Sequence, residues 1–284
     1  MDRIDLHTHT NFSDGTLSPT ELVRLAKESG VGCLAITDHD TIDGVAEALV
    51  AGKTFGVAVI GGCELSAMTE YGELHILGLW VTPCKALLDM LSELRGTRAR
   101  RNQAMLARLN DLGISLSMEE VRSFAGQGSI GRPHIAQALQ ARGLVQSVRQ
   151  AFERYIGAGC PAFVPKESPS PEALVQRLSA SGAVVSLAHP FLHHYPNDWL
   201  YQRIQSLQAH GLDALEAWHS EHSPEQSKQC RQWAERLGLA LTGGSDFHGT
   251  TKPGVFLGVG RHNLCLGWDL LQALEAIRVK KQGR

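Results

Sequence analysis

The 284-residue sequence lacks the features that would place it in several common classes of protein. It contains no apolar run long enough to span a bilayer, so we expect no membrane insertion. Its formal net charge is −2, which gives no reason to expect non-specific nucleic-acid binding through bulk charge. The chain opens directly into a strand-like segment that carries polar functional groups, so we expect no signal peptide.

Paired cysteines and phosphate-binding glycine patterns are missing as well. The six cysteines are scattered, and no two of them have CxxC spacing. In a chain of this size they indicate reduced, mostly buried thiols and a cytoplasmic protein. The sequence also has no Walker glycine pattern and no apparent Ser-His-Asp or Cys-His set, so it predicts neither a P-loop nor a covalent side-chain nucleophile.

Histidine and carboxylate side chains, by contrast, gather at the ends of short apolar runs that are typical of β-strands. The chain contains 13 histidines. Imidazole and carboxylate groups bind divalent metals, and side chains at strand ends form the active site of a parallel barrel. The pattern therefore predicts a metalloenzyme. The groups concerned are His7, His9 and Asp14, then Asp38, His39 and Asp40, then Glu64 and His75, then His189, and finally Asp246 and His248.

Seven strand-like runs alternate with helix-like segments along the chain. This alternation predicts parallel βα units, and seven strands suggest a closed or nearly closed barrel. One helix start is explicit, because Ser18 and Pro19 precede an amphipathic segment that Gly30 ends. The predicted strands cover residues 4–9, 32–37, 57–65, 73–81, 183–189, 214–219 and 239–246.

The pattern changes between residues 85 and 165, where no convincing strand appears. Helices are predicted at 87–111, from 117 onward, at 132–140 and at 147–155. The length of the chain suits one domain that carries an insertion. We therefore predict a barrel domain from residues 1–84 and 166–284. A small all-helical insertion domain, residues 85–165, would follow the fourth strand and cap the substrate over the C-terminal rim.

Local sequence supports some of the candidate ligands more than others. His7 and His9 lie two residues apart on a strand, so both side chains point to one face and could grip one metal. Glu64 lies in an apolar run that demands burial, and a buried carboxylate without a partner is costly. His75 could equally be a core histidine with satisfied hydrogen bonds. Asp40 has two open interpretations, a helix N-cap or a supporting contact behind His39.

Taken in order, these motifs resemble the PHP (polymerase and histidinol phosphatase) family. They are the His-Thr-His of the first strand, Asp38-His39-Asp40, the lone Glu64, His75, His189-Pro190 and Ser245-Asp246-Phe247-His248. The resemblance covers both ends of the chain and all seven predicted strands. It implies a distorted (β/α)7 barrel that holds two or three divalent ions and hydrolyses phosphate esters. Manganese is the first expectation for the metal, with zinc and iron as alternatives.

The resemblance also implies how the ligands are shared among the ions. One ion would be held by His7, His9, Glu64 and Asp246, a second by Glu64, His75 and His189, and a third by Asp14, His39 and His248. The catalytic group would be a metal-bound hydroxide held by Glu64 and Asp246. Several members of the family have a histidine where Asp14 stands, and this difference would alter the third site.

Within the family, the helical insertion with Gly131-Arg132-Pro133-His134 is similar to a branch of nucleoside 3′,5′-bisphosphate phosphatases and 5′→3′ exoribonucleases. We therefore expect removal of the 3′-phosphate from a nucleoside 3′,5′-bisphosphate, giving the nucleoside 5′-monophosphate and phosphate, and a further activity on short RNA. Two alternatives remain. Histidinol phosphatase is disfavoured by a second phosphate-binding element, and a non-catalytic metal-binding regulatory scaffold is disfavoured by the complete ligand set.

A phosphate ester also needs positive charge away from the metals. Arg132 is the first candidate because its planar fork matches phosphate and because it leads into a helix, although it could be an exposed arginine at that helix start. Lys252 is the second, against a solvated loop lysine. The basic cluster from Arg95 to Arg108 is predicted to be a solvated helix face. Four histidines could line the pocket or be packing or surface residues, namely His134, His194, His219 and His222.

Overall fold

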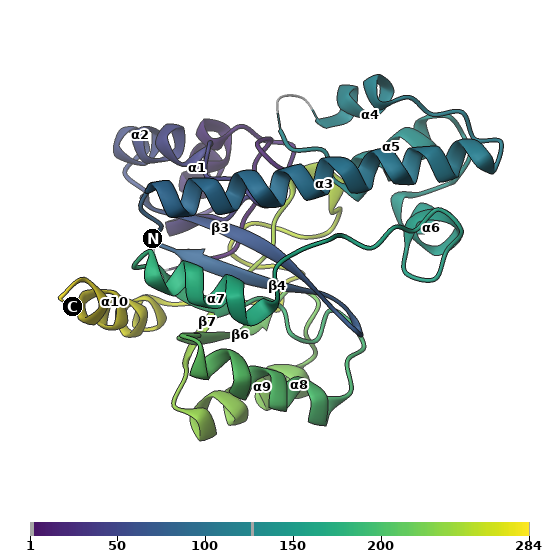
Figure 1. Ribbon diagram of the computed structural model, residues 1–284. Coiled ribbons are helices and arrows are strands. Elements are labelled where there is room, and N and C mark those ends of the chain that lie inside the picture. Colours follow the sequence, from purple (N-terminus) through teal and green to yellow (C-terminus); the bar gives the residue numbers. More distant parts are fainter. Residues whose placement is uncertain (1–2, 126–127, 284) are drawn as a thin grey trace.

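The structure is a computed structural model that describes residues 3–125 and 128–283. Seven strands form one sheet in the order β1 to β7, with helices around it (Figure 1). All seven predicted strands are confirmed, although individual ends differ. The strands are β1 (Arg3–Asp5), β2 (Val31–Ile36), β3 (Ala58–Thr69), β4 (Gly72–Leu79), β5 (Val184–Leu187), β6 (Ala214–His219) and β7 (Ala240–Gly244).

Helices connect most of the strands, and several of them begin at a serine whose side chain caps the helix. The Ser18 side chain accepts a hydrogen bond from the backbone N–H of Glu21, and Pro19 is the first residue of α1, as predicted. Such caps satisfy donors that a helix start leaves unpaired. The helices around the sheet are α1 (Pro19–Glu28), α2 (Val45–Phe55), α7 (Pro171–Ala180), α8 (Asn197–Ala209), α9 (Pro224–Leu237) and α10 (Trp268–Gln282), with the 3-10 turn η2 (Gly249–Thr251).

The direction of one strand differs from the prediction of uniformly parallel βα units. β1, β2 and β3 run parallel to one another, as do β5, β6 and β7, but β4 is antiparallel to both of its neighbours. β3 ends at Thr69 and β4 begins at Gly72. A connection this short allows only a hairpin, because a parallel pair needs a long crossover.

The first and last strands approach each other closely enough to make the barrel nearly closed. Beyond β1, the backbone N–H of Leu6 donates to Gly243 at 3.2 Å, and the carbonyl of His7 accepts from the N–H of Asp246 at 2.8 Å. A Cβ on Gly244 would lie 2.4 Å from the Cβ of His7, so this contact requires glycine. The predicted nearly closed barrel is therefore confirmed, and its closure lies beside the candidate ligands.

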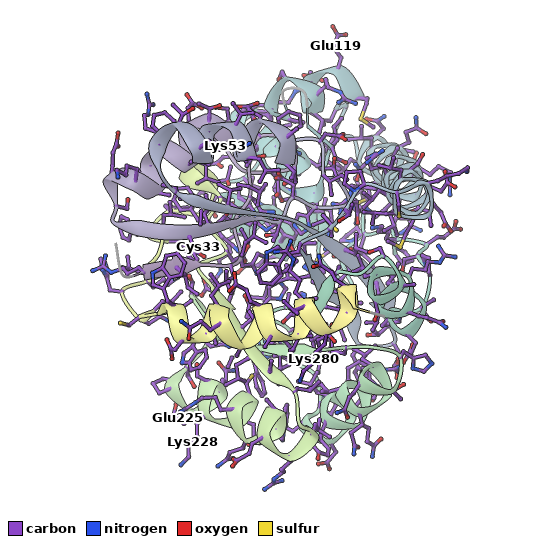
Figure 2. All side chains as sticks on the ribbon, turned by 90° about the vertical axis from the view of Figure 1, so that its left-hand side faces the viewer. Cys33, Lys53, Glu119, Glu225, Lys228 and Lys280 are labelled. Carbon is purple, nitrogen blue, oxygen red and sulfur yellow. The ribbon has the colours of Figure 1, made fainter. Side chains whose placement is uncertain are left out.

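Apolar side chains from six strands fill the interior of the barrel, and α10 closes one end of it. One hydrophobic cluster joins Ile4, Cys33, Ile60 and other strand residues to Leu271 and Leu274 of α10. Figure 1 places α10 on the side away from α4 to α6, and Figure 2 views this side, with α10 across the front and Lys280 labelled. The opposite end of the barrel carries the candidate metal ligands.

Residues between β4 and α7 form the helical segment that the sequence predicts. The first half of α3 packs Leu87, Leu91 and Leu94 into the barrel cluster, and its second half packs Met105 and Leu109 against the other helices of the segment. α3 thus spans the barrel and the segment (Figure 1). The division into two domains remains a prediction. The segment comprises α3 (Lys85–Asp111), α4 (Met118–Ala125), α5 (Arg132–Ala141), α6 (Val148–Ala151) and the π-turn η1 (Phe152–Ile156).

Two expectations from composition can be compared with the described residues. No helix among them is long and apolar enough to cross a membrane. All six cysteines are free. Cys33, Cys63 and Cys230 are buried, whereas Cys84 and Cys265 are exposed, so the expectation of mostly buried thiols holds for only half of them.

The closure of the barrel should depend on Asp5. Its buried carboxylate accepts hydrogen bonds from the backbone N–H groups of Ser245 and Gly258, both at 2.8 Å. We predict that Asp5→Ala lowers the free energy of unfolding by about 2–5 kcal/mol, because it leaves buried donors unpaired. Urea unfolding in the presence of a chelator measures this without a contribution from metal binding. The exposed Asp111→Ala is the control, and equal stability of the two variants would contradict the prediction.

Candidate metal centre

The carboxylate of Glu64 lies at the centre of the candidate metal site and is almost completely buried. It stands on β3 and contacts the imidazole rings of five histidines. Their nitrogens lie within 3.4 Å of a Glu64 oxygen: His39 at 3.1 Å, His9 at 3.2 Å and His7 at 3.4 Å from Oε2, and His75 at 2.8 Å and His189 at 2.9 Å from Oε1. Both oxygens therefore face imidazole groups, as a carboxylate that bridges two ions would require.

The strand pattern explains why these side chains converge. Most of them follow the C-terminal end of a parallel strand: His7 and His9 after β1, His39 after β2, His189 after β5, and Asp246 and His248 after β7. His75 instead lies near the start of antiparallel β4, opposite Ser66 and diagonally across from Glu64. Diagonal neighbours on one face of an antiparallel pair are in reach of each other. The reversal of β4 therefore brings its N-terminal end to the same rim.

Two further carboxylates complete the cluster. Asp246 Oδ1 lies 3.3 Å from the Nε2 of His9 and 3.3 Å from the Nδ1 of His248. Asp14 Oδ1 lies 3.2 Å from the Nε2 of His248, and Asp14 Oδ2 lies 3.8 Å from the Nε2 of His39. All nine predicted metal ligands, including Asp14, are thus brought together at one end of the barrel.

The residues present fit divalent ions by an observation independent of the motifs. Among the described residues, several buried atoms of the cluster have no partner in hydrogen-bonding geometry, although some lie close to a neighbouring ligand atom: Nε2 of His7, His9 and His75, Nδ1 of His39, and Oδ1 of Asp14. A buried polar group without a partner is costly, and coordination removes this cost. Four groups have ligand atoms within 4.8 Å of one another: His9-Asp14-His39-His248, His7-His9-Asp246, His7-Glu64-His189 and His39-Glu64-His75.

These groupings differ in detail from the sets that the resemblance implies. His9 joins Asp14, His39 and His248 as well as His7 and Asp246, and His39 joins Glu64 and His75. The assignment of each ligand to one of two or three ions therefore remains a prediction.

Electrostatics favour ionised carboxylates and two neutral imidazoles, whereas for His7 and His9 burial would lower the pKa but the surrounding carboxylates outweigh it and raise it. Burial would raise the pKa of Glu64, but the neighbouring His39, His75 and His7 outweigh it and hold this pKa well below its usual value. The pKa of Asp14 is likewise held low against burial, by His248 and His39. Burial lowers the pKa of both His39 and His189 to about 3, so these rings are neutral. Ionised carboxylates and neutral imidazoles are the ligand forms.

Three residues of the site have unusual backbone conformations. Asp40, His189 and Asp246 have φ values of 54°, 23° and 54°, in the left-handed region. Residues other than glycine adopt such conformations at a cost, and they cluster at functional sites. Here the strain accompanies the sharp exits of the chain from β2, β5 and β7.

Glu216 supports the cluster from behind and was not singled out by sequence reasoning. Its Oε1 lies 3.0 Å from the Nδ1 of His7, and its Oε2 accepts a hydrogen bond of 2.6 Å from the backbone N–H of His189. The bond to Nδ1 leaves the Nε2 of His7 free to face Glu64 and Asp246. The signal was available, since Glu216 is a carboxylate inside the apolar run 214–219 and resembles Glu64 in this respect.

Asp40 is not a helix N-cap, and its carboxylate is paired with cations. The residue before α2 is Gly44, so the N-cap interpretation is wrong. The fully buried Asp40 carboxylate instead accepts hydrogen bonds from Arg98, at 2.6 and 2.9 Å, and from Lys166 at 2.8 Å. Burial would raise its pKa, but these two cations lower it far below the usual value. Asp40 therefore supports His39 by anchoring the helical segment beside it.

The prediction of a solvated arginine face on α3 is also wrong for two of its members. Arg98 and Arg101 are 7% and 4% exposed and line the cavity above the metal cluster, whereas Arg100 is exposed. Their spacing of three residues places them on one helix face. Arg101 lies 3.3 Å from Glu73, which also forms an ion pair with Arg132.

The cavity that contains these groups has a volume of about 290 Å³. Its lining includes several of the candidate metal ligands and four cationic side chains, Arg98, Arg101, Arg132 and Lys252. Lys252 forms an ion pair with Asp246. Both predicted cations therefore face the cavity, although each already has an acidic partner.

The four histidines proposed for the pocket have different positions. His219 is buried, with Nε2 at 3.1 Å from Asp246 Oδ2, and His222 packs behind it against Phe191. His134 lines a neighbouring groove. His194 is exposed and does not line the cavity, whereas the adjacent His193 does. A one-residue difference of this kind in a loop cannot be resolved from the sequence.

Comparison with known proteins identifies the family. The PHP domain model matches residues 5–158 of the 284. The chain belongs to the PHP family. Like the nearly closed barrel, this relationship was expected from the order of the motifs, and it makes the protein a metal-dependent phosphoesterase, which is a hydrolase.

Relatives of this PHP protein are similar over almost their whole length. A 5′-3′ exoribonuclease from Haemophilus influenzae is 34% identical over 247 residues, covering 87% of this chain and 90% of its own. A 3′,5′-nucleoside bisphosphate phosphatase from Chromobacterium violaceum is 32% identical over 256 residues, covering 89% and 90%. A solved structure from Bifidobacterium adolescentis, proposed to be a metal-dependent phosphoesterase, has a TM-score of 0.87 at 33% identity and covers 99% of this chain and 98% of its own.

Glu64 should be essential for metal retention by the PHP site. We predict that Glu64→Gln lowers the number of manganese ions retained per chain after dialysis, because it removes the charge shared by the surrounding imidazoles. Elemental analysis by mass spectrometry measures the bound metal. The exposed Glu70→Gln, on the β3–β4 turn, is the matched control. Full retention in Glu64→Gln would exclude a bridging role.

Glu216 should tune metal affinity without touching an ion. We predict that Glu216→Gln weakens metal binding by about 10- to 100-fold, since the orientation of His7 is no longer fixed by a carboxylate. Isothermal titration calorimetry with the metal measures this affinity. The control is Glu225→Gln, at the start of α9, whose side chain projects outward in Figure 2. Equal affinities in the two variants would show that the contact with His7 carries no energy.

Proposed function

We propose that this PHP protein removes the 3′-phosphate from a nucleoside 3′,5′-bisphosphate, giving the nucleoside 5′-monophosphate and phosphate, and also acts as a 5′→3′ exoribonuclease on short RNA. The proposal combines the phosphoesterase class of the family with a second phosphate-binding element in the same cavity. The names of the relatives from Haemophilus influenzae and Chromobacterium violaceum support the same two reactions.

The observation that carries the proposal is the excess of positive charge beside the metal ligands. Four cations meet two carboxylates in this part of the site: Arg98 and Lys166 pair with Asp40, and Arg101 and Arg132 pair with Glu73. Four positive charges against two negative ones leave a net charge of about +2. Burial and the neighbouring Arg98 lower the pKa of Arg101 to about 9, so it is still protonated at neutral pH. A phosphate dianion would balance this excess.

A nucleoside bisphosphate suits these two elements because its phosphates are separated by one ribose. The 5′-phosphate would bind Arg98, Arg101 and Arg132, and the 3′-phosphate would lie over the carboxylate and histidine cluster. A monophosphate would leave this excess of positive charge unbalanced. This argument disfavours histidinol phosphatase activity, since histidinol phosphate has one phosphate and a cationic remainder. The full ligand set similarly disfavours a non-catalytic scaffold.

The chain's own residues would act by binding, orienting and screening charge. His7, His9, Asp246, Glu64, His39, His75, His189, Asp14 and His248 would hold two or three divalent ions, and we propose manganese. When bound, such ions would lower the pKa of a bound water molecule toward neutrality and would offset the negative charge of the phosphoryl oxygens. The ammonium of Lys252 faces the same region and would screen charge on the phosphoryl oxygens. The arginines would fix the distal phosphate, so that the 3′-ester is held in one orientation.

The substrate assignment can be tested through Arg132. For the manganese-loaded protein, we predict that Arg132→Ala raises KM for adenosine 3′,5′-bisphosphate by about 10- to 100-fold, because it removes charge-assisted hydrogen bonds to the distal phosphate. KM for an aryl phosphate, which has no second phosphate, should change little. Phosphate release measures both reactions.

The control for this experiment is Arg100→Ala, whose side chain is 66% exposed on the same helix as Arg98. It should behave as the wild type with both substrates. Equal effects of Arg132→Ala on the two substrates would remove Arg132 from the phosphate site. Absence of phosphate release from every nucleoside 3′,5′-bisphosphate by the wild type would refute the proposed substrate.

A further inference from the structure

A second cavity adjoins the metal cavity. It is a groove of about 900 Å³ between α4, α5 and α6 of the helical segment and the loops that follow β1 and β7. The groove and the metal cavity share four lining residues, Asp14, Val148, Thr251 and Lys252. The two spaces therefore meet at the candidate ligand Asp14 and at the cation that faces Asp246.

The lining of the groove matches a flexible polyanion with bases. Among the described residues that line it, Asp14 is the one acidic side chain, whereas Arg149, Lys252 and Arg261 are basic. Arg149 and Arg261 also pair with Glu153 and Glu221. Amides and hydroxyls make up much of the remaining wall, and Phe124 is 39% exposed there. Exposed aromatic rings stack on bases of single strands, and polar groups bind phosphate and sugar.

His134 adds a donor of defined orientation to this wall. Its Nδ1 accepts a hydrogen bond of 2.9 Å from the backbone N–H of Gly131. Burial lowers the pKa of its ring, so the neutral ring carries its proton on Nε2. The ring lines the groove, and the Nε2–H is the donor left for a ligand. This side chain, predicted to contact substrate, therefore serves the groove instead of the metal cavity.

The order of groups across the cavity gives the groove a direction. A chain of contacts runs from Arg132 to Glu73, His75, Glu64, His39 and finally Asp14. In this series of contacts the arginine comes first, the cluster follows, and Asp14, which also lines the groove, comes last. A strand whose 5′-phosphate binds the arginines would place its first 3′-phosphodiester over the cluster and its remaining nucleotides in the groove.

We propose that this groove binds the 3′ continuation of a 5′-phosphorylated oligoribonucleotide, downstream of the bond that is cleaved. The inference rests on the proposed function and extends it. In both substrates the same P–O3′ bond breaks: the oxygen of water joins phosphorus, and the 3′-oxygen leaves with a proton. With a bisphosphate, the product is free phosphate and the groove stays unused. With RNA, the shortened strand keeps the phosphate as a new 5′-phosphate and can enter again.

The test adds a negative charge to the groove. Gln137 of α5 lines the groove and is half-buried, and Gln140, one helical turn later, lines it and is exposed. In Gln137→Glu, repulsion should lower kcat/KM for a 5′-phosphorylated tetranucleotide about tenfold more than for the bisphosphate. Gln140→Glu should act in the same direction. Because Gln140 is exposed, this substitution should not disturb folding. The control Gln205→Glu, exposed on α8, should leave both substrates as in the wild type.

Binding provides a readout that does not depend on turnover. Fluorescence anisotropy with 5′-phosphorylated, phosphorothioate-linked di-, tri- and tetranucleotides should show affinity for the wild type that rises with length. This rise should be reduced in Gln137→Glu and retained in Gln205→Glu. Two results would overturn the proposal that the groove binds RNA. One is an affinity that does not depend on length, and the other is an equal loss of kcat/KM for the tetranucleotide and the bisphosphate in Gln137→Glu.

The outcome also separates the groove from the proposed function. Bisphosphate hydrolysis without any length dependence would refute the groove alone. Length-dependent binding that Gln137→Glu weakens, without hydrolysis of any bisphosphate, would support the groove and refute the bisphosphatase assignment.

Discussion

The burial of one carboxylate among five imidazoles is the interaction on which the rest of the site depends. Glu64 is 1% exposed and lies on β3 between Cys63 and Leu65, which pack in the core. An uncompensated charge at such a depth costs several kcal/mol, so the histidines, and the ions they could hold, stabilise the fold as well as serve the chemistry. The position of Glu64 fixes where every other ligand must converge.

This requirement explains features of the barrel that a uniform βα pattern would not produce. The reversal of β4 brings His75 to the rim beside Glu64. Asp38 holds the loop after β1 by accepting hydrogen bonds from Thr10 and Ser13 at 2.6–2.7 Å. Asp5 and Glu216 perform similar roles beside β7 and β5. Buried carboxylates therefore form a second layer that orients the histidines.

The helical segment supplies Arg98, Arg101 and Arg132 to the cavity, and the loop after β7 supplies Lys252. The long helix α3 of the helical segment is held in the barrel core at one end, and Arg98 reaches Asp40 directly behind His39. The same anchoring positions Arg101 and Arg132 over the cavity and shapes the groove beyond it. The candidate metal ligands and the arginines proposed to bind phosphate thus come from different parts of the chain, and Asp40 couples their positions.

Much of this arrangement could be predicted from the sequence. The seven strands, the helical segment and the metal ligands follow from hydrophobic periodicity, cap residues and motifs, because these are local properties of the chain. His7 and His9 could be paired from their spacing alone, and Glu64 from its presence in an apolar run.

Only the tertiary structure decided the rest. One of the two cationic partners of Asp40 is Lys166, 126 residues away, and no local pattern records such a contact. The sequence alone predicts that Arg98 and Arg101 are solvated. Their burial follows only from which face of α3 packs on the barrel. The same holds for His193 in place of His194, and for the direction of β4. Local sequence determines which elements form and which ligands exist, whereas long-range packing determines which polar side chains share a cavity.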